Sequence, residues 1–363
     1  MMKKFALGLL GAVSALAVTT GAANAQSKTV NIYNWSDYIG ETTLADFTKA
    51  TGINPKYDVY TDLETLEAKL LTGNSGYDVV VPTAEPTLRK LIQAKAVQKL
   101  DKSKIPNLKN LDPQLMARVA QSDPNNEYGA IYQWGTVGVG YNVDKVKAAL
   151  GVEKIDSWKQ VFDPANAKKL AGCGIVMLDS PTDILPSMFH YLGLDVNSEK
   201  AEDLKKVEDA LMAIRPSVKT FVPSVIDPLA GGDACVAIGY SGDVFQAQAK
   251  AAEGTKIEYS IPQEGAQLWF DVLAIPAGAP NVDAAHAYIN FVLDPKNMAG
   301  ITNFVSYANA VPASLASVNE EIKTNPAIYP PAALAAKLFT VKQVSQRTDQ
   351  ARNRTWTKIK TGR

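Results

Sequence analysis

Aromatic and acidic side chains occur together in short apolar runs that have the composition of β-strands. The clearest case is QLWFDVLAIP (267–276), in which Trp269 and Asp271 are two residues apart. Because successive side chains of a strand point to opposite faces, Trp269 and Asp271 share one face. A carboxylate in so apolar a run is costly to bury unless a cation or hydrogen-bond donors meet it. Asp271 therefore has two interpretations: it receives a cationic ligand, or it is a buried acid satisfied by backbone N–H groups or an arginine.

Three further segments place an acid just after an apolar run: NWSDY (34–38), LDSPTD (178–183) and GYSGD (239–243). Each has a structural alternative. Asp243 is placed to cap a helix beginning near Val244, and Ser180 with Asp183 fits a capping box. The carboxyl ends of strands in open α/β sheets are nevertheless where ligands bind, so four acid-bearing strand ends favour one cationic ligand.

Carboxylates and aromatic rings together suit a particular class of cation. Carboxylates hold ammonium groups through charge-assisted hydrogen bonds. Aromatic faces cover methylene chains and attract cations, at about 0.5–2 kcal/mol per contact. A linear polyamine, with ammonium groups separated by apolar spacers, matches both features.

The elements that must position these residues alternate between β-branched runs and helical patterns. Strands are expected at 29–33, 77–81, 135–142, 174–178, 235–240 and 268–276, and helices at 42–51, ended by Gly52, and 63–71. Continuous apolar strands separated by helices predict parallel sheets covered on both faces, hence the α/β class. The length of 363 residues calls for two such units.

The first 25 residues are typical of a secretory signal peptide. Lys3 and Lys4 precede an apolar run at 5–18, and Ala23-Asn24-Ala25 supplies a small-x-small cleavage site. The run is too short to span a bilayer as a stable helix, and no later stretch approaches about 20 apolar residues. We expect cleavage after Ala25 and a periplasmic mature protein that does not insert into the membrane.

Composition and motifs exclude several function classes. Lys and Arg together number 37, as do Asp and Glu, so the basic excess of a nucleic-acid binder is missing. The sequence has no G-x-S-x-G, P-loop, H-E-x-x-H or C-x-x-C motif. We therefore expect no enzyme activity, no catalytic residue, no metal site and no cofactor. His190 and His286 are expected on ordinary helix surfaces.

Cys173 and Cys235 are the two cysteines of the chain. An even pair in an oxidising compartment most often forms a disulfide. Both precede apolar strand-like runs, which predicts neighbouring strands of one sheet. The alternative is two buried thiols that pack as small hydrophobic groups.

Over essentially the whole mature chain, the sequence resembles the periplasmic spermidine/putrescine-binding proteins of ABC transporters, and most of all their putrescine-binding branch. The segments that carry the resemblance are YNWSDYI (33–39), YDVVVPT (77–83), GVGYNVDKV (138–146), DSP (179–181), VAIGYSGDV (236–244), FDVLAIP (270–276), SYANA (306–310) and NPAIYPP (325–331).

The resemblance implies a type II periplasmic-binding-protein fold, in which two α/β lobes joined by crossing strands close over a ligand cleft. We expect lobe 1 at 27–134 plus about 250–304, and lobe 2 at 135–249 plus about 305–363. The ligand-binding residues that the resemblance implies, with Glu85 added as an acid near the cleft, are Trp35, Ser36, Asp37, Tyr38, Thr83, Glu85, Asp183, Tyr240, Asp243, Trp269, Asp271 and Tyr307. The alternative for Glu85 is a surface loop residue.

Two departures from the putrescine branch bear on specificity. Trp269 stands where that branch tends to have Phe, and W-x-D is the pattern of spermidine-binding relatives. Asp183 is one methylene shorter than the Glu common at its position, which leaves extra room. Both changes favour spermidine over putrescine.

The implied role is to capture a polyamine as a monomer and deliver it to an inner-membrane ABC permease. One alternative is a sensor that presents bound polyamine to a membrane receptor, and another is binding of a different small organic cation. A cationic amino acid would need an arginine for its carboxylate, and the matched segments contain none. A hydrolase is disfavoured because no nucleophile–base set is present.

Overall fold

The computed structural model describes residues 28–363, and the predicted signal peptide at 1–25 lies outside the described residues. The strands are β1 (Thr29–Trp35), β2 (Asn54–Tyr60), β3 (Val79–Val80), β4 (Val97–Gln98), β5 (Gly129–Asn142), β6 (Ile175–Leu178), β7 (Val218–Val222), β8 (Val236–Tyr240), β9 (Ile257–Ser260), β10 (Gln267–Pro276) and β11 (Ala308–Asn309).

Helices pack around these strands. They are α1 (Thr43–Thr51), α2 (Leu63–Leu71), α3 (Arg89–Gln93), α4 (Pro113–Val119), α5 (Val143–Leu150), α6 (Lys159–Phe162), α7 (Pro164–Leu170), α8 (Pro181–Tyr191), α9 (Ala201–Ile214), α10 (Ile226–Ala230), α11 (Ser241–Lys250), α12 (Val282–Val292), α13 (Pro295–Val305), α14 (Glu320–Lys323), α15 (Ala332–Ala335) and α16 (Gln346–Thr361). Shorter helical turns are η1 (Ala84–Leu88), η2 (Lys102–Lys104), η3 (Pro106–Asn110), η4 (Pro124–Asn126), η5 (Arg215–Ser217) and η6 (Pro312–Ala316).

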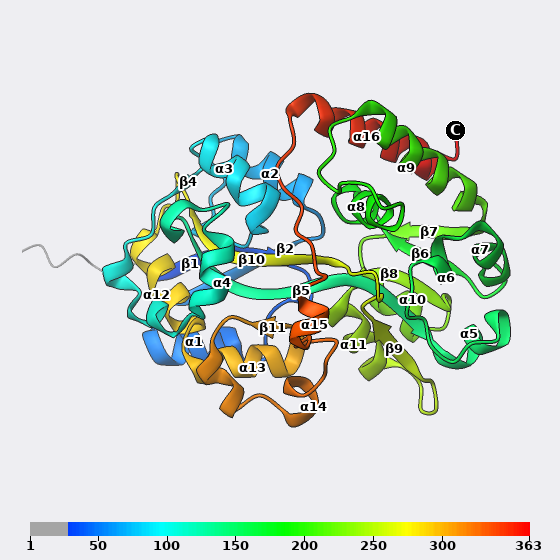
Figure 1. The fold of residues 1–363 in the computed structure, drawn as a ribbon. Helices are drawn as coiled ribbons and strands as arrows, with labels where there is room; N and C mark the ends of the chain where they lie inside the picture. The colour runs from blue at the N-terminus through cyan, green and yellow to red at the C-terminus, as the bar shows by residue number, and fades with distance from the viewer. Residues whose placement is uncertain (1–27) are drawn as a thin grey trace, which may run out of the picture.

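Within the described residues, the eleven strands form one sheet with the order β2-β1-β3-β10-β5-β8-β6-β7, while β4 pairs with β10, and β9 and β11 pair with β5. Figure 1 shows one α/β half around β1 and β2 and another around β6 and β7, with the long strands β5 and β10 running between them. The α/β class expected from the sequence is confirmed.

The strand directions correct the expectation of parallel sheets. β1 is parallel to β2 and β3, and β6 is parallel to β7 and β8. β10, however, is antiparallel to β3 and β5, and β5 is antiparallel to β8. Every residue of β10 is buried. Its continuous apolar run therefore reflects burial on both faces, which holds for a central strand of either direction.

Local signals located several elements well. α1 ends at Gly52, which takes the left-handed conformation (φ 73°) that favours glycine. α2 has the predicted bounds, and Asp163 caps α7 through the N–H groups of Ala165 and Asn166. β5, in contrast, begins at Gly129, six residues before the predicted start at 135, because its N-terminal part also pairs with β10.

The predicted disulfide between Cys173 and Cys235 is present. The two cysteines precede β6 and β8, which pair in parallel as neighbouring strands. This bridge ties together two strands of the half that contains β6 and β7.

The expectation for one histidine is wrong. His286, on α12, is only 3% exposed. Its Nε2 accepts a hydrogen bond from the Asp101 N–H at 2.9 Å, and its Nδ1 lies 2.8 Å from the Val282 carbonyl oxygen. A helix residue whose two ring nitrogens are both satisfied in this way is buried without penalty. None of the described helices is both long and apolar enough to cross a membrane.

Candidate functional site

The residues predicted to bind a ligand come together around one cavity of about 230 Å³. All twelve line it, although they come from distant segments of the chain: Trp35, Ser36, Asp37, Tyr38, Thr83, Glu85, Asp183, Tyr240, Asp243, Trp269, Asp271 and Tyr307. The volume suits a small ligand, since pockets for drug-sized molecules run from about 300 to 1,000 Å³.

Strand ends explain this convergence. Trp35 ends β1, and Tyr240 ends β8. Asp183 and Asp243 lie in the first turns of α8 and α11, the helices that follow β6 and β8. β1, β6 and β8 are all members of parallel pairs, and their carboxyl ends border the cavity, as expected for a ligand site in an α/β sheet.

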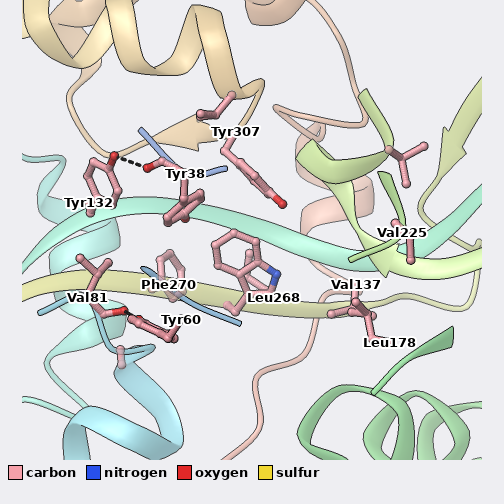
Figure 2. Packing of buried hydrophobic residues seen from close by; sticks show 14 of the residues in the cluster. Tyr38, Tyr60, Val81, Tyr132, Val137, Leu178, Val225, Leu268, Phe270 and Tyr307 are labelled. Atoms are coloured by element: carbon pink, nitrogen blue, oxygen red, sulfur yellow. Dashed lines mark hydrogen bonds between the residues drawn. The ribbon is translucent and has the colours of Figure 1, made fainter. Parts of the chain in front are cut away.

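Aromatic rings form much of the cavity wall. The Trp269 ring lies 5.3 Å from that of Tyr307 and 5.8 Å from that of Tyr240, measured between centroids. Tyr38 contacts Tyr307 edge to face at 5.1 Å, and Figure 2 shows these two side chains beside β5. Trp35 lies 4.7 Å from a further aromatic ring, that of Tyr60. Rings of this kind offer apolar faces to methylene groups and negative potential to cations.

Two glycines make room for these rings. A Cβ at Gly135 of β5 would lie 2.6 Å from the Trp269 indole, and a Cβ at Gly242 would overlap the ring of Tyr307. Neither position needs glycine for its φ angle, so close approach of an aromatic side chain is the reason for the small residue.

Asp271 is the most perturbed acid of the cavity. It is 4% exposed, and its Oδ1 accepts a hydrogen bond from the Thr83 hydroxyl at 2.6 Å. The pKa of Asp271 is raised to about 7, chiefly by burial and in smaller part by the Asp183 charge, although the Thr83 hydrogen bond opposes the rise. Neither an arginine nor a backbone N–H of the described residues bonds this carboxylate, so the structural alternative is not what the geometry shows.

Asp243 is held by hydroxyl groups. Its Oδ1 accepts from the Tyr307 hydroxyl at 2.7 Å, and its Oδ2 accepts from Ser224 at 3.1 Å. Burial raises the pKa of Asp243 to about 6, and the nearby Asp37 charge contributes to the rise. The side chain makes no capping bond to α11, whose N-cap residue is Tyr240.

Asp183 is bonded by three neutral donors. Its Oδ2 accepts from the hydroxyls of Ser180 at 2.6 Å and Tyr240 at 2.7 Å, and its Oδ1 accepts from the Gln267 amide at 3.0 Å. Burial raises the pKa of Asp183, while these three bonds oppose the rise. Ser180 makes no side-chain cap bond, so the capping box that the sequence allowed is not formed.

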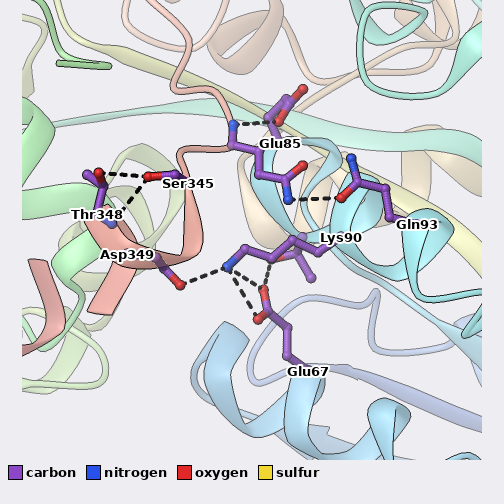
Figure 3. A network of polar contacts seen from close by, with 9 residues as sticks. Glu67, Glu85, Lys90, Gln93, Ser345, Thr348 and Asp349 are labelled. Atoms are coloured by element: carbon purple, nitrogen blue, oxygen red, sulfur yellow. Dashed lines mark hydrogen bonds and ion pairs between the residues drawn. The ribbon is translucent and has the colours of Figure 1, made fainter. Parts of the chain in front are cut away.

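Glu85 lines the cavity, but its carboxylate is bonded to other groups. Oε1 accepts from Arg89 at 3.1 Å, and Oε2 accepts from the Gln343 backbone N–H at 3.1 Å. Figure 3 shows this contact between η1 and the segment that leads into α16. Glu85 is therefore a weaker candidate for ligand contact than the four aspartates.

A second contact in Figure 3 links the same two regions. Lys90 on α3 lies 3.4 Å from Glu67 on α2 and 3.5 Å from Asp349 on α16. With the Glu85–Gln343 bond, this polar network joins α2 and α3 to the start of α16.

The charged side chains that line the cavity are all acidic. Five acidic side chains line it, and none of its lining residues in the described chain is Lys, Arg or His. Within 28–363, no three His, Cys, Asp or Glu side chains gather in a way that could hold a metal ion. Buried carboxylates beside aromatic rings favour an organic cation as the ligand.

Sequence reasoning missed nine residues that line the cavity: Tyr60, Thr61, Leu63, Pro86, Thr182, Pro223, Ser224, Gln267 and Val341. A signal existed for Gln267, because it precedes Trp269 and Asp271 by two and four residues and so shares their face of β10. Val341 gave no signal, since it enters from an irregular segment after α15.

Comparison with known proteins identifies relatives of the chain. Residues 42–330 match the family described as bacterial extracellular solute-binding protein. The chain is 48% identical to the putrescine-binding periplasmic protein SpuD of Pseudomonas aeruginosa strain UCBPP-PA14, over 100% of both chains. It is 47% identical to the putrescine-binding periplasmic protein PotF of Escherichia coli K12, over 99% of both.

A solved structure agrees with these relatives. The putative spermidine/putrescine ABC transporter protein from Listeria monocytogenes superposes with a TM-score of 0.84 at 31% identity, over 93% of this chain and 100% of that one. The family resemblance expected from the sequence motifs, and the two-lobe solute-binding fold that it implied, are confirmed.

Proposed function

Because the chain belongs to the bacterial extracellular solute-binding proteins, we propose that it captures a linear polyamine in the periplasm and delivers it to an ABC-transporter permease. One observation carries this proposal: a small cavity is lined by five acids and walled by aromatic rings. A ligand with a carboxylate of its own, such as an amino acid, would be repelled by these acids. A neutral ligand would leave the buried carboxylates without a counter-charge.

Putrescine is the polyamine that we propose. Relatives at 48% and 47% identity carry the name of putrescine-binding proteins, while the structure named for both spermidine and putrescine is 31% identical. The preference for spermidine expected from Trp269 and Asp183 is not supported by these relatives. A larger indole reduces the space beside Tyr307 and Tyr240 as much as it extends the apolar surface, so ring size alone is a poor guide to ligand length.

We assign the two ammonium groups of putrescine to two acidic ends of the cavity. Asp37 and Asp243, which are near enough for one charge to raise the pKa of the other, take one ammonium. Asp271, with Thr83 beside it, takes the other. The rings of Trp269 and Tyr307 cover the four methylene groups between them. Eleven of the twelve residues predicted from the sequence remain, in this proposal, the ligand-binding set, and Glu85 is left out because Arg89 and Gln343 already bond its carboxylate.

Binding is proposed to draw two lobes together. β5 and β10 are the strands that run through both halves of the sheet, so bending them changes the angle between the halves. A ligand that contacts acids of both halves stabilises the closed arrangement over the open one. The lobe boundaries at 134/135, 249/250 and 304/305, and the monomeric state, stay predictions.

Isothermal titration calorimetry of the ligand-free mature protein tests the function. We expect putrescine to bind one-to-one at micromolar concentration or below. 1,4-Butanediol is the matched control ligand, because it has the same chain length without positive charge, and we expect no binding. Absence of putrescine binding to protein shown to be folded, or equal binding of the diol, would overturn the proposal.

A further inference from the structure

A second cavity, of about 480 Å³, adjoins the one lined by five acids, which we call the acidic cavity. Glu85, Trp269 and Val341 line both, so the two cavities share a wall. The charged residues that line the second cavity are Glu85, Arg89, Arg118 and Lys342. Three cations beside one acid leave an excess of positive charge, which favours an anionic ligand.

Two of these cations, and one buried hydroxyl, are available to a ligand. The side chains of Arg118 and Lys342 form no ion pair or hydrogen bond within residues 28–363. Ser122 is 5% exposed and lines the cavity, and its hydroxyl has no hydrogen-bond partner in the same part of the chain. Ser122 Oγ is not among the fully enclosed polar atoms, so a ligand in the cavity can reach it. A carboxylate oxygen would accept the hydrogen bond that this hydroxyl can donate.

Apolar side chains form much of the remaining wall of the second cavity. Leu268 and Phe270 lie on the face of β10 opposite to Asp271, because successive side chains of a strand alternate. Val119 and Val341 are also buried and line the same cavity. An inorganic ion would leave this apolar surface in contact with water, and a neutral apolar molecule would leave the cations unused. The lining therefore fits an amphipathic carboxylate, with an anionic head and an apolar body.

Glu85 connects the two cavities. Its Oε1 accepts a hydrogen bond from Arg89 Nη1 at 3.1 Å, and Arg89 also donates to the Gln121 carbonyl oxygen at 2.8 Å. The Arg89 side chain is 42% exposed, and exposed ion pairs contribute little to stability, so another carboxylate can replace Glu85 as its partner. Arg89 lines the second cavity but not the acidic one. An anion bound by Arg89 therefore leaves the charge of Glu85 available to a cation in the acidic cavity.

We propose that the second cavity is an effector site for an amphipathic carboxylate, which binds Arg89, Arg118 and Lys342 and strengthens polyamine binding by taking Arg89 from Glu85. The inference rests on the proposed function, because the effect is on polyamine affinity. Its direction follows from charge, since a released Glu85 carboxylate attracts an ammonium group. Ordinary salt has the opposite effect, because it screens the attraction between acids and ammonium groups.

The test uses phenylacetate as the anionic probe and phenylacetamide as the matched ligand of the same shape without charge. Ligand-observed NMR with the wild-type protein should show phenylacetate binding at about millimolar concentration and far weaker binding of the amide. In calorimetry at constant ionic strength, putrescine should bind about fivefold more tightly in saturating phenylacetate than in sodium chloride. Phenylacetamide should leave the putrescine affinity unchanged.

The double variant Arg118→Gln with Lys342→Gln removes the two unpaired cations, neither of which lines the acidic cavity. Its phenylacetate affinity should fall about tenfold or more, while its putrescine affinity without phenylacetate should change less than about twofold. Arg347→Gln is the matched control, since Arg347 is an exposed arginine that lines neither cavity, and it should respond to phenylacetate as the wild type does. Glu85→Gln should still bind phenylacetate but lose the effect on putrescine.

The two parts of the inference have separate refutations. Equal binding of phenylacetate and phenylacetamide, or unchanged phenylacetate binding by the double variant, would refute the anion site. A putrescine affinity that does not rise with phenylacetate, or that rises fully in Glu85→Gln, would refute the exchange of Arg89. Failure of the wild-type protein to bind putrescine would refute the proposed function instead, and the NMR measurement would still decide whether the anion site exists.

Discussion

Replacing Asp271 by Asn should abolish tight putrescine binding and at the same time stabilise the ligand-free protein. Burial raises the pKa of this carboxyl from 3.8 to about 7. The protonated form is therefore favoured by folding, and this contribution to stability is lost as the pH rises from about 4 through 7. At about 1.4 kcal/mol per pH unit, ionisation at pH 8 costs the ligand-free fold at most about 4 kcal/mol.

Asparagine has the shape of the protonated acid and keeps an oxygen for the Thr83 hydroxyl. We therefore expect Asp271→Asn to be more stable than the wild type at pH 8, by up to about 4 kcal/mol, and by less than about 1 kcal/mol at pH 4. Putrescine affinity should fall by more than a hundredfold, because one ammonium is left in a buried site without its counter-charge.

Urea unfolding of ligand-free protein, followed by tryptophan fluorescence at both pH values, measures the stability difference. Asp78 supplies the control, since it is a buried aspartate bonded by the backbone N–H groups of Asn31 and Asn281, at 2.7 and 2.6 Å. Asp78→Asn should destabilise the protein by about 1–3 kcal/mol at pH 8. If Asp271→Asn is likewise less stable than the wild type at pH 8, or still binds putrescine normally, the reasoning about Asp271 is wrong.

Three other expectations follow from the same contacts. Putrescine affinity should rise by about a hundredfold or more from pH 5 to pH 8. The pKa values of about 7 for Asp271 and about 6 for Asp243 mean that both acids must lose a proton before they can hold ammonium. An affinity that stays constant in calorimetry across this pH range would contradict the expectation. Replacing Cys173 and Cys235 by serine should lower the free energy of unfolding by about 2–4 kcal/mol in urea titrations while leaving putrescine affinity unchanged, since neither lines the cavity. Glu85→Gln should weaken putrescine binding by no more than about fivefold, because the energy at stake is that of a partly exposed ion pair. A hundredfold loss of affinity in calorimetry would show instead that Glu85 contacts the ligand directly.

The acids of the cavity were predictable because the fold class places strand ends together, whereas Thr83 and Tyr307 were predicted only from the family resemblance. Once a run such as LWFDV is identified as a strand, its period of two puts Trp269 and Asp271 on one face. Acids that follow other strands of an α/β sheet then meet at the same edge. The same rule reaches Gln267 if the strand is extended by one residue. Val341 and Ser224 lay beyond it, because irregular segments have no period from which a facing direction follows.

Strand direction and histidine burial were not predictable for a related reason. An apolar run shows that both faces of β10 are covered, but direction depends on which strands lie beside it, and those are far away in the sequence. His286 likewise depends on Asp101, whose backbone N–H reaches its ring from 185 residues away. Local patterns report what is buried, while tertiary contacts determine its partners.

The cost of burying the acids of the cavity gives a ligand control over the proposed closure. Closing the halves around five acids without a cation removes carboxylates from water, and burial raises the pKa values of Asp271 and Asp243 in the direction that such a cost requires. In the proposed mechanism, a polyamine supplies positive charge as the carboxylates are desolvated, so it binds the closed arrangement more strongly than the open one. Such a difference in affinity is what shifts a conformational equilibrium. The aromatic walls alone would stabilise the closed arrangement around any apolar chain. The acids restrict this stabilisation to chains that carry positive charge. In the proposed mechanism, selectivity for polyamines over neutral molecules of the same length therefore arises from the cost of closing the halves around the acids as much as from the contacts made after closure.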